Sequence, residues 1–386
     1  MPELDDPRTF PDAAPVECAR LHALAAASQS AQGQEAAALD GQVVRALREM
    51  LAPGQGERLA ALFATAPSVA IHRHLWRLLV ECEQPLGGVG RAENTMAVTV
   101  FAIPLVIVVG AEGESLAQAT ICGVLDDAAA LTAILRENGA LSGNLTFALA
   151  NVLTSAAAID LVRLPEIHSW RALPEAIAPM RELEPAPITL LRGPETVHLR
   201  FLLGSAIAAP DANLLADNGV GKWGIPFAHA LGRQLANSAV APGVSVLALP
   251  RAPQTLLRAA RQGRASQREV GAQIFASNAI RKLRASVGEP TAVISAHRAP
   301  DAIGGGEVRL SLSSPFDPRE AEGFRCPLYP LDRVEDVVAM LTDLLAECRV
   351  TDVRVIAGVH ADRDPDTGLP LLFKGDTALP SVNAVH

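Results

Sequence analysis

A serine, a histidine and an aspartate close together near residue 300 have the residue types of a hydrolytic triad. They are Ser295, His297 and Asp301. In such a triad a histidine accepts the proton of the serine that attacks the substrate. Ser295 and His297 alternate in a predicted strand, so their side chains face the same side and can touch. The alternative is a strand followed by a polar hairpin loop, because the chain has no Gly-x-Ser-x-Gly motif and this pattern supplies no oxyanion hole.

Three aspartates alternate in the segment 362–368, as they do in loops that bind calcium through oxygen ligands. They are Asp362, Asp364 and Asp366. An EF-hand loop would need glycine in place of Thr367 and a bidentate glutamate in place of Phe373. Because aspartate, proline and glycine also make ordinary turns, the sequence favours a solvated turn over a calcium site.

Two other patterns, a histidine pair and two glycine-rich segments, are candidate binding sites for a metal or an anion. His72 and His74 lie in a predicted helix, where residues two apart point about 200° around the axis from each other, so both cannot hold one metal. We expect them to be surface histidines. The glycine-rich segments 218–224 and 304–306 lack the spacing of a phosphate-binding loop. We therefore expect no cofactor.

Basic residues are concentrated between residues 251 and 284, in a chain whose formal net charge is −9. This basic island could contact nucleic acid or an acidic protein surface. The alternative is a solvated helix face, because arginine favours helices and covers apolar surface with its stem. The residues considered for partner binding are Arg258, Arg261, Arg264, Arg268, Arg281, Lys282 and Arg284.

The composition is that of a globular protein, with 49% hydrophobic and 19% charged residues in a chain of 386. The net negative charge opposes broad binding to nucleic acid or to anionic membranes. The five cysteines are widely spaced and form no Cys-x-x-Cys pair, which is typical of a reducing compartment. The acidic N-terminus has no signal-peptide pattern. We expect a cytoplasmic protein.

The apolar run at residues 97–110 is either a membrane span or a buried strand. A membrane helix needs about 18 to 20 consecutive apolar residues, and this run is shorter and contains Thr99 and Pro104. Its β-branched residues favour a buried strand. Because proline cannot donate to a sheet ladder, Pro104 should mark a bulge, a break between two strands or an edge position.

The chain is predicted to have an α+β fold, with mixed sheets, packed helices and a helical N-terminal module. Helices are expected over 34–51, from residue 56 and over 69–81. In the last third, helices over 266–287 and 331–348 accompany strands at 291–296, 307–312 and 353–359. The expected units are a helical module at 1–88, α/β units at 89–185 and 186–264, and an α+β unit at 265–386.

A predicted β-α-β-α order repeats at an offset of about 100 residues, which suggests an internal duplication. The first copy comprises strand 97–109, helix 124–137, strand 144–152 and helix 163–173. The second comprises strand 196–208, helix 225–238, strand 243–249 and helix 252–262. Few residues match between the copies, so a chance likeness of two β-α-β-α stretches is the alternative.

The order of elements from about residue 97 to residue 374 resembles that of a beta-proteobacterial family of cytosolic proteins, known as a domain of unknown function. The segments that carry the resemblance are Leu328 to Leu331, the helix that ends at Cys348, Val350 to Arg354 and Gly368 to Phe373. A cysteine pair of the family is replaced here by Asp364 and Asp366. The resemblance implies a shared fold and no activity.

These observations leave three hypotheses for function. The first is a non-catalytic scaffold that binds a protein partner or a second copy of itself. The second is a hydrolase that uses Ser295, His297 and Asp301. The third is binding of nucleic acid or an acidic partner through the basic island.

Overall fold

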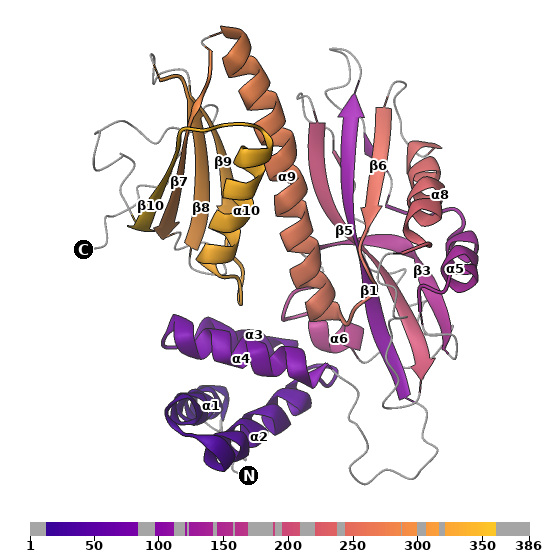
Figure 1. Cartoon of the computed structure of the whole chain (residues 1–386). Helices are drawn as coiled ribbons and strands as arrows, with labels where there is room; N and C mark the ends of the chain where they lie inside the picture. Colours follow the sequence, from indigo (N-terminus) through magenta and orange to yellow (C-terminus); the bar gives the residue numbers. More distant parts are fainter. Residues whose placement is uncertain are drawn as a thin grey trace, which may run out of the picture.

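The structure is a computed structural model. It describes residues 13–83, 97–111, 120–121, 123–141, 145–156, 159–168, 188–189, 195–208, 221–237, 244–286, 288–298, 306–315 and 321–359. A helical module lies at one end of two sheets, and the long helix α9 (Leu256–Ser286) lies between the sheets (Figure 1). The predicted α+β class is confirmed. Within the described ranges, no helix is both long enough and apolar enough to cross a membrane.

The N-terminal module consists of the helices α1 (Ala13–Ser30), α2 (Gly33–Met50), α3 (Gly56–Ala64) and α4 (Val69–Cys82). Apolar residues at helical spacing bury Leu21, Leu47 and Leu75 completely in a shared core. Ser68 caps α4, because its hydroxyl accepts a hydrogen bond from the amide of Ile71. The helices predicted over 34–51 and 69–81 are confirmed.

The first sheet is antiparallel and has the order β3-β5-β1-β6. Its strands are β1 (Ala97–Ala111), β3 (Thr146–Ser155), β5 (Glu195–Ala208) and β6 (Val244–Pro250). Helix α5 (Ala128–Glu137) lies between β1 and β3 in the chain, and α8 (Gly224–Asn237) lies between β5 and β6. These four strands and two helices follow one another in the order β-α-β-β-α-β. This connectivity is called split βαβ or ferredoxin-like.

Three short elements complete this part of the chain. The strands β2 (Thr120–Ile121) and β4 (Ile188–Thr189) pair with each other in a small separate sheet. Helix α6 (Leu164–His168) contacts α3 and β1. The short α6 stands where the sequence predicted a longer helix over 163–173, and residues 169–173 lie outside the described ranges.

Both faces of the first sheet are buried, which explains the apolar sequence of β1. Phe101, Ile103 and Leu105 belong to the core beneath α5 and α8. Val100 and Ala102 belong to a second core, which α9 and the helical module share. A strand covered on both faces has a nearly continuous apolar sequence instead of an alternating one. The apolar run is thus a buried strand, as predicted.

Pro104 lies in the middle of a central strand, opposite a bulge. Leu105 pairs with Pro250, whereas Ala102 pairs with Gln254, so the partner segment contains one extra residue. The carbonyl oxygen of Pro104 accepts a hydrogen bond from the amide of Arg251, at 2.8 Å. The amide hydrogen that proline lacks would have pointed toward this irregular stretch. Of the three predicted positions, the bulge is the one observed.

The C-terminal sheet has the order β10-β7-β8-β9. Its strands are β7 (Thr291–Arg298), β8 (Gly306–Ser313), β9 (Ala321–Pro327) and β10 (Val353–Val359). Strands β7, β8 and β9 are antiparallel neighbours, and β10 pairs parallel to β7. Helix α10 (Val334–Glu347) and α9 pack on one face of this mixed sheet (Figure 1).

Helix α9 belongs to two hydrophobic cores. Its first turns, with Leu256 and Ala259, pack in the core beneath the first sheet, and its later turns, with Ala276 and Leu283, pack against the C-terminal sheet. The sequence predicted two helices, at 252–262 and 266–287, but α9 is one continuous helix of 31 residues. The expected unit boundary at residue 264 therefore lies inside a helix.

Close contact between the helical module and the rest of the chain depends on Gly56. A Cβ atom at Gly56 would lie 1.8 Å from the carbonyl oxygen of Val162, whereas a Cβ atom at Gly41 would meet nothing within 4 Å. We expect Gly56→Ala to lower the free energy of unfolding by about 1–3 kcal/mol, because the two segments must separate. Gly41→Ala, inside α2, should raise it by about 0.5–1 kcal/mol. Urea denaturation of both variants checks this, and equal stabilities would contradict the close approach.

Candidate functional site

Ser295 and His297 are in hydrogen-bonding contact on β7. The Ser295 Oγ and His297 Nε2 atoms are 2.7 Å apart, and both side chains are buried. The predicted shared orientation of the two side chains is confirmed. Asp301, the third residue of the predicted triad, lies outside the described residues. The described part of the site is therefore a serine and histidine pair.

Charged residues of the neighbouring strand lie opposite this pair. In the strand register, Arg309 is opposite Ser295 and Glu307 is opposite His297. The Glu307 carboxylate accepts one hydrogen bond from Arg309 Nε at 2.5 Å and another from Arg325 Nε at 2.9 Å. The Arg309 side chain is completely buried. Such burial is tolerable for a guanidinium only with a bonded counter-charge.

The sheet that carries this cluster has one apolar face and one polar face. Val308, Leu310 and Leu312 of β8 point into the core formed with α9 and α10. Glu307, Arg309 and Ser311 alternate with them and point to the other face, yet they are also buried. Glu307, Arg309 and Arg325 were not predicted from the sequence. The strict alternation of polar and apolar residues over 307–312 was a signal that could have identified Glu307 and Arg309.

The geometry allows one kind of chemistry. A histidine nitrogen within hydrogen-bonding distance of a serine hydroxyl can accept its proton and make the oxygen a nucleophile. The Ser311 hydroxyl, on the same polar face, is buried without a hydrogen-bond partner among the described residues. We name Ser295, His297, Glu307, Arg309 and Arg325 the polar-face cluster.

The first half of the basic island holds the segment between β9 and α10. Arg268 donates to the Asp332 carboxylate at 2.7 Å and to the carbonyl oxygen of Pro327. The Arg264 guanidinium lies 4.5 Å from the centre of the Tyr329 ring, and Arg261 donates to the carbonyl oxygen of Leu331. These three arginines therefore bind other parts of the same chain, whereas the sequence analysis predicted them as candidates for partner binding.

The second half of the island makes local contacts at the surface. Arg281 donates to Asn278, Lys282 pairs with Glu322, and Arg284 pairs with Glu289 and donates to the carbonyl oxygen of Cys348. Arg258 is exposed on the first turns of α9. Partner binding through these residues stays a prediction, and their contacts give most of them a structural role.

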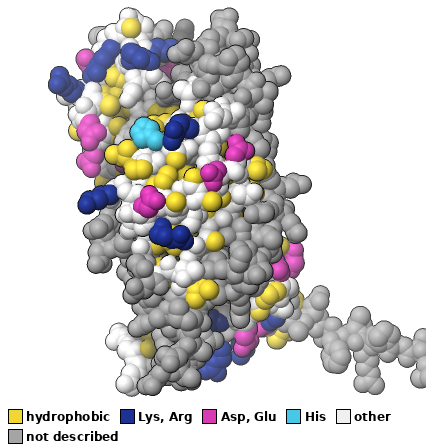
Figure 2. Space-filling view, turned by 90° about the vertical axis from the view of Figure 1, so that its right-hand side faces the viewer, with side chains coloured by type: hydrophobic (Ala, Val, Ile, Leu, Met, Phe, Trp, Pro, Cys, Tyr) yellow, Lys and Arg dark blue, Asp and Glu magenta, His cyan; other side chains and the backbone are white. Residues whose placement is uncertain are grey.

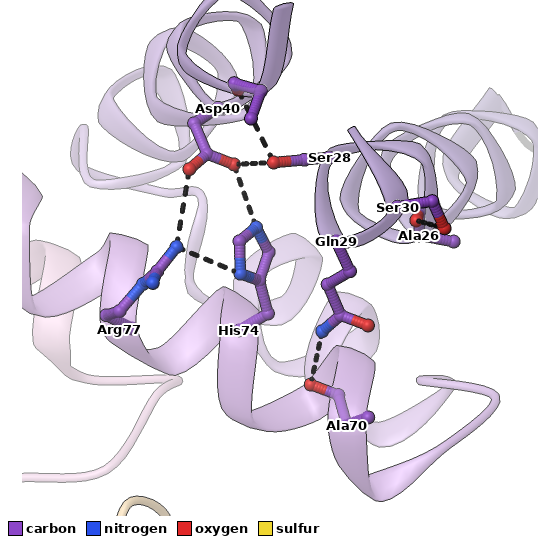
Figure 3. Close-up of polar contacts among 9 residues, drawn as sticks. Ala26, Ser28, Gln29, Ser30, Asp40, Ala70, His74 and Arg77 are labelled. Atoms are coloured by element: carbon purple, nitrogen blue, oxygen red, sulfur yellow. Dashed lines mark hydrogen bonds and ion pairs between the residues drawn. The ribbon is translucent and has the colours of Figure 1, made fainter. Parts of the chain in front are cut away.

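A second polar cluster joins three helices of the N-terminal module (Figure 3). Asp40 Oδ1 accepts hydrogen bonds from Ser28 Oγ at 2.5 Å and from His74 Nε2 at 2.8 Å. Arg77 donates to Asp40 Oδ2 and to His74 Nδ1. Because an arginine can only donate, His74 Nδ1 must be an acceptor and Nε2 must carry the hydrogen. Ser28 and His74 both bind Asp40 and do not bind each other, so this cluster holds the three helices together.

His72 and His74 were predicted to lie at the surface, and neither is fully exposed. His74 is buried against Asp40, and His72 is half-buried with its ring edge-on to Phe63 at 5.5 Å. Burial, with the charge of Arg73, lowers the pKa of His72. The two rings have different partners, as expected for a helix. The described residues contain no group of three or more His, Cys, Asp or Glu side chains placed to hold a metal, and Asp362, Asp364 and Asp366 lie outside them.

The surface seen from the side of α5 and α8 shows charged side chains of both signs dispersed among apolar ones (Figure 2). Ile225, at the start of α8, is 72% exposed. Lys and Arg side chains gather along the upper edge of this view, whereas both signs of charge mix over its middle.

Comparison with known proteins identifies no relative, since no family model, curated protein or solved structure matches the chain. The resemblance to a beta-proteobacterial family stays a prediction.

The pair of Arg268 and Asp332 should contribute strongly to stability. Their side chains are only 10% and 9% exposed, whereas Lys282 in its pair with Glu322 is 60% exposed. We expect Asp332→Ala to lower the free energy of unfolding by about 3 kcal/mol, because it leaves a buried guanidinium without its carboxylate. Lys282→Ala should change it by less than about 1 kcal/mol. Urea denaturation measures both, and similar losses would show that the buried pair has no special role.

Proposed function

We propose that the protein is a non-catalytic scaffold that binds a partner protein with surfaces of one rigid body. The observation that carries this proposal is the junction of residues 327–332, where three parts of the chain meet. Arg73 of α4 donates to the carbonyl oxygen of Asp332, and Arg268 of α9 binds the carboxylate of the same residue. Asp332 itself precedes α10 of the C-terminal unit. One residue thus contacts the helical module and α9 while belonging to the third unit.

The shared hydrophobic cores support the same proposal. The helical module, one face of the first sheet and the first turns of α9 contribute to a single core. The later turns of α9 then continue into the core of the C-terminal sheet. Units joined through buried apolar surface keep their relative position more firmly than units joined by a small polar interface. A chain built in this way presents surfaces at fixed relative positions.

The scaffold proposal predicts a stoichiometric partner whose binding needs an intact junction. We expect the purified protein to form a complex of defined mass with one chain, either a second copy or a different protein. Light scattering of the purified components measures that mass. Asp332→Ala, which disrupts the junction, should weaken that complex at least about tenfold, whereas Asp343→Ala on the exposed face of α10 should not. A protein that stays monomeric and binds no purified candidate would contradict the proposal.

A second proposal rests on the 2.7 Å contact between Ser295 and His297. In this proposal the protein hydrolyses an ester. Ser295 Oγ attacks the ester carbonyl carbon and passes its proton to His297 Nε2, the alcohol leaves with that proton, and water then releases the acid from the acyl-serine. Both side chains are buried, so the polar face must open for a substrate to reach them.

Covalent labelling separates the two proposals. The hydrolase proposal predicts that a fluorophosphonate probe modifies Ser295 in the native protein, as mass spectrometry of peptides would reveal. His297→Asn should slow labelling by about 100-fold or more, since a general base contributes that much. Ser311→Ala, on the same polar face, should label at the original rate. Absence of a label on native protein would contradict the hydrolase and leave the scaffold.

An internal duplication is a further proposal about the first sheet. The order β1, α5, β3 in the first half of this unit recurs as β5, α8, β6 in the second half. A two-fold rotation between the central strands exchanges β1 with β5, β3 with β6 and α5 with α8. The split βαβ arrangement has this symmetry in any sequence, so the common origin of the halves is a proposal that the repeated order of elements supports.

A further inference from the structure

Glu83 lies where the helical module meets the first turn of α9. It follows α4 directly, and both oxygens of its carboxyl group accept the amide hydrogen of Leu257, at 3.0 and 2.9 Å. The two residues are 174 positions apart in the sequence. Glu83 is only 4% exposed. A residue of one unit thus binds an amide that the first turn of a helix in another unit leaves unsatisfied.

The groups that face this carboxyl group come from three helices. Arg258 and Thr255 lie beside it at the start of α9. Cys82 and Glu81 precede Glu83 in α4, and the charges of Arg48 in α2, of Glu81 and of Glu83 act on Cys82. The single nearby cation, among the described groups that act on Glu83 directly, is Arg258, which is itself exposed. Among the residues that the structure describes, this buried carboxyl group therefore has no close ionic partner.

Burial raises the pKa of Glu83 to about 8, and the amides of Leu257 and Arg258, the Thr255 side chain and the charge of Arg258 only partly oppose this effect. In an undocked module the group would be in water, with an ordinary pKa of about 4.5. The docked state therefore binds the proton more tightly than the undocked state. Docking is strongest below about pH 4.5, weakens as the pH rises to about 8 and changes little above that.

We propose that Glu83 is a proton-controlled latch that fastens the helical module to the first turn of α9. When protonated, its carbonyl oxygen accepts the Leu257 amide at no cost in buried charge. When ionised, the same contact confines a carboxylate in the interior. The latch adds regulation to the scaffold, because it sets how firmly one end of the rigid body is held.

Hydrogen exchange of the full chain between pH 5 and pH 9 tests the latch. Protection factors, corrected for the intrinsic exchange rate at each pH, are compared for α1–α4 and for β7–β9. In the wild type we expect the protection of α1–α4 to fall at least about tenfold from pH 5 to pH 8 and then level off, since each pKa unit of difference changes the docking equilibrium tenfold. Protection of β7–β9 should change less.

Two variants make the test specific. Glu83→Gln keeps a carbonyl acceptor and cannot ionise, so its protection should be independent of pH over this range. Glu81→Gln is the matched control, because Glu81 is exposed two residues away, and it should behave as the wild type. A wild type whose α1–α4 protection is flat with pH, or a Glu83→Gln protein with the same pH dependence as the wild type, would overturn the proposal. If Glu83→Gln does not fold, the pH dependence of α1–α4 protection in the wild type alone tests the proposal.

Discussion

One helix must fill two hydrophobic cores, and the rest of the structure depends on this constraint. α9 is long because its first turns pack beneath the first sheet while its later turns pack on the C-terminal sheet. Its path brings Gly263 so close to the first sheet that a Cβ atom there would lie 2.8 Å from Leu199 and 3.0 Å from Pro104. The bulge opposite Pro104 lies in the segment that leads into this helix. The strand irregularity and the small residue are thus two consequences of placing one helix.

Polar contacts then fix the parts around α9. Glu83 binds its first turn and Arg268 in its middle binds Asp332, both in largely buried contacts. Arg284 near its end donates at the surface to the carbonyl oxygens that follow α10. Each buried polar group costs free energy unless it is bonded, so these contacts favour one relative position of the units over others. Apolar packing alone, which is not directional, would tolerate sliding along the helix. The scaffold proposal follows from this combination of shared cores and specific polar contacts.

Much of the fold could be predicted from the sequence, because the signals are local. Helical spacing identified α2, α4 and α10, and the β-branched run identified β1 as a buried strand. Prediction failed where distant residues decide the structure. The apparent end of a helix near residue 264 reflects a change of buried face as α9 passes from one core to the next, not a break in the backbone. β9 was missed because its polar and glycine-containing sequence is stabilised by pairing with β8.

The candidate site shows the same division. The contact of Ser295 with His297 could be predicted, since it follows from alternation in one strand. The contributions of Glu307, Arg309 and Arg325 depend on the register of three strands, which the sequence does not encode locally. For the same reason the arginines at 261, 264 and 268 were interpreted as a surface for partners, whereas their targets are about 60 to 70 residues away in the sequence.

The central claim is that the helical module and the first sheet belong to one body. Urea unfolding followed separately at Trp76, in α4, and at Trp223, buried beneath the first sheet, tests it most directly. Single-tryptophan variants give each signal, and far-ultraviolet circular dichroism reports the whole chain. The account predicts three coincident transitions with one midpoint. An early transition at Trp76, with Trp223 still native, would contradict it.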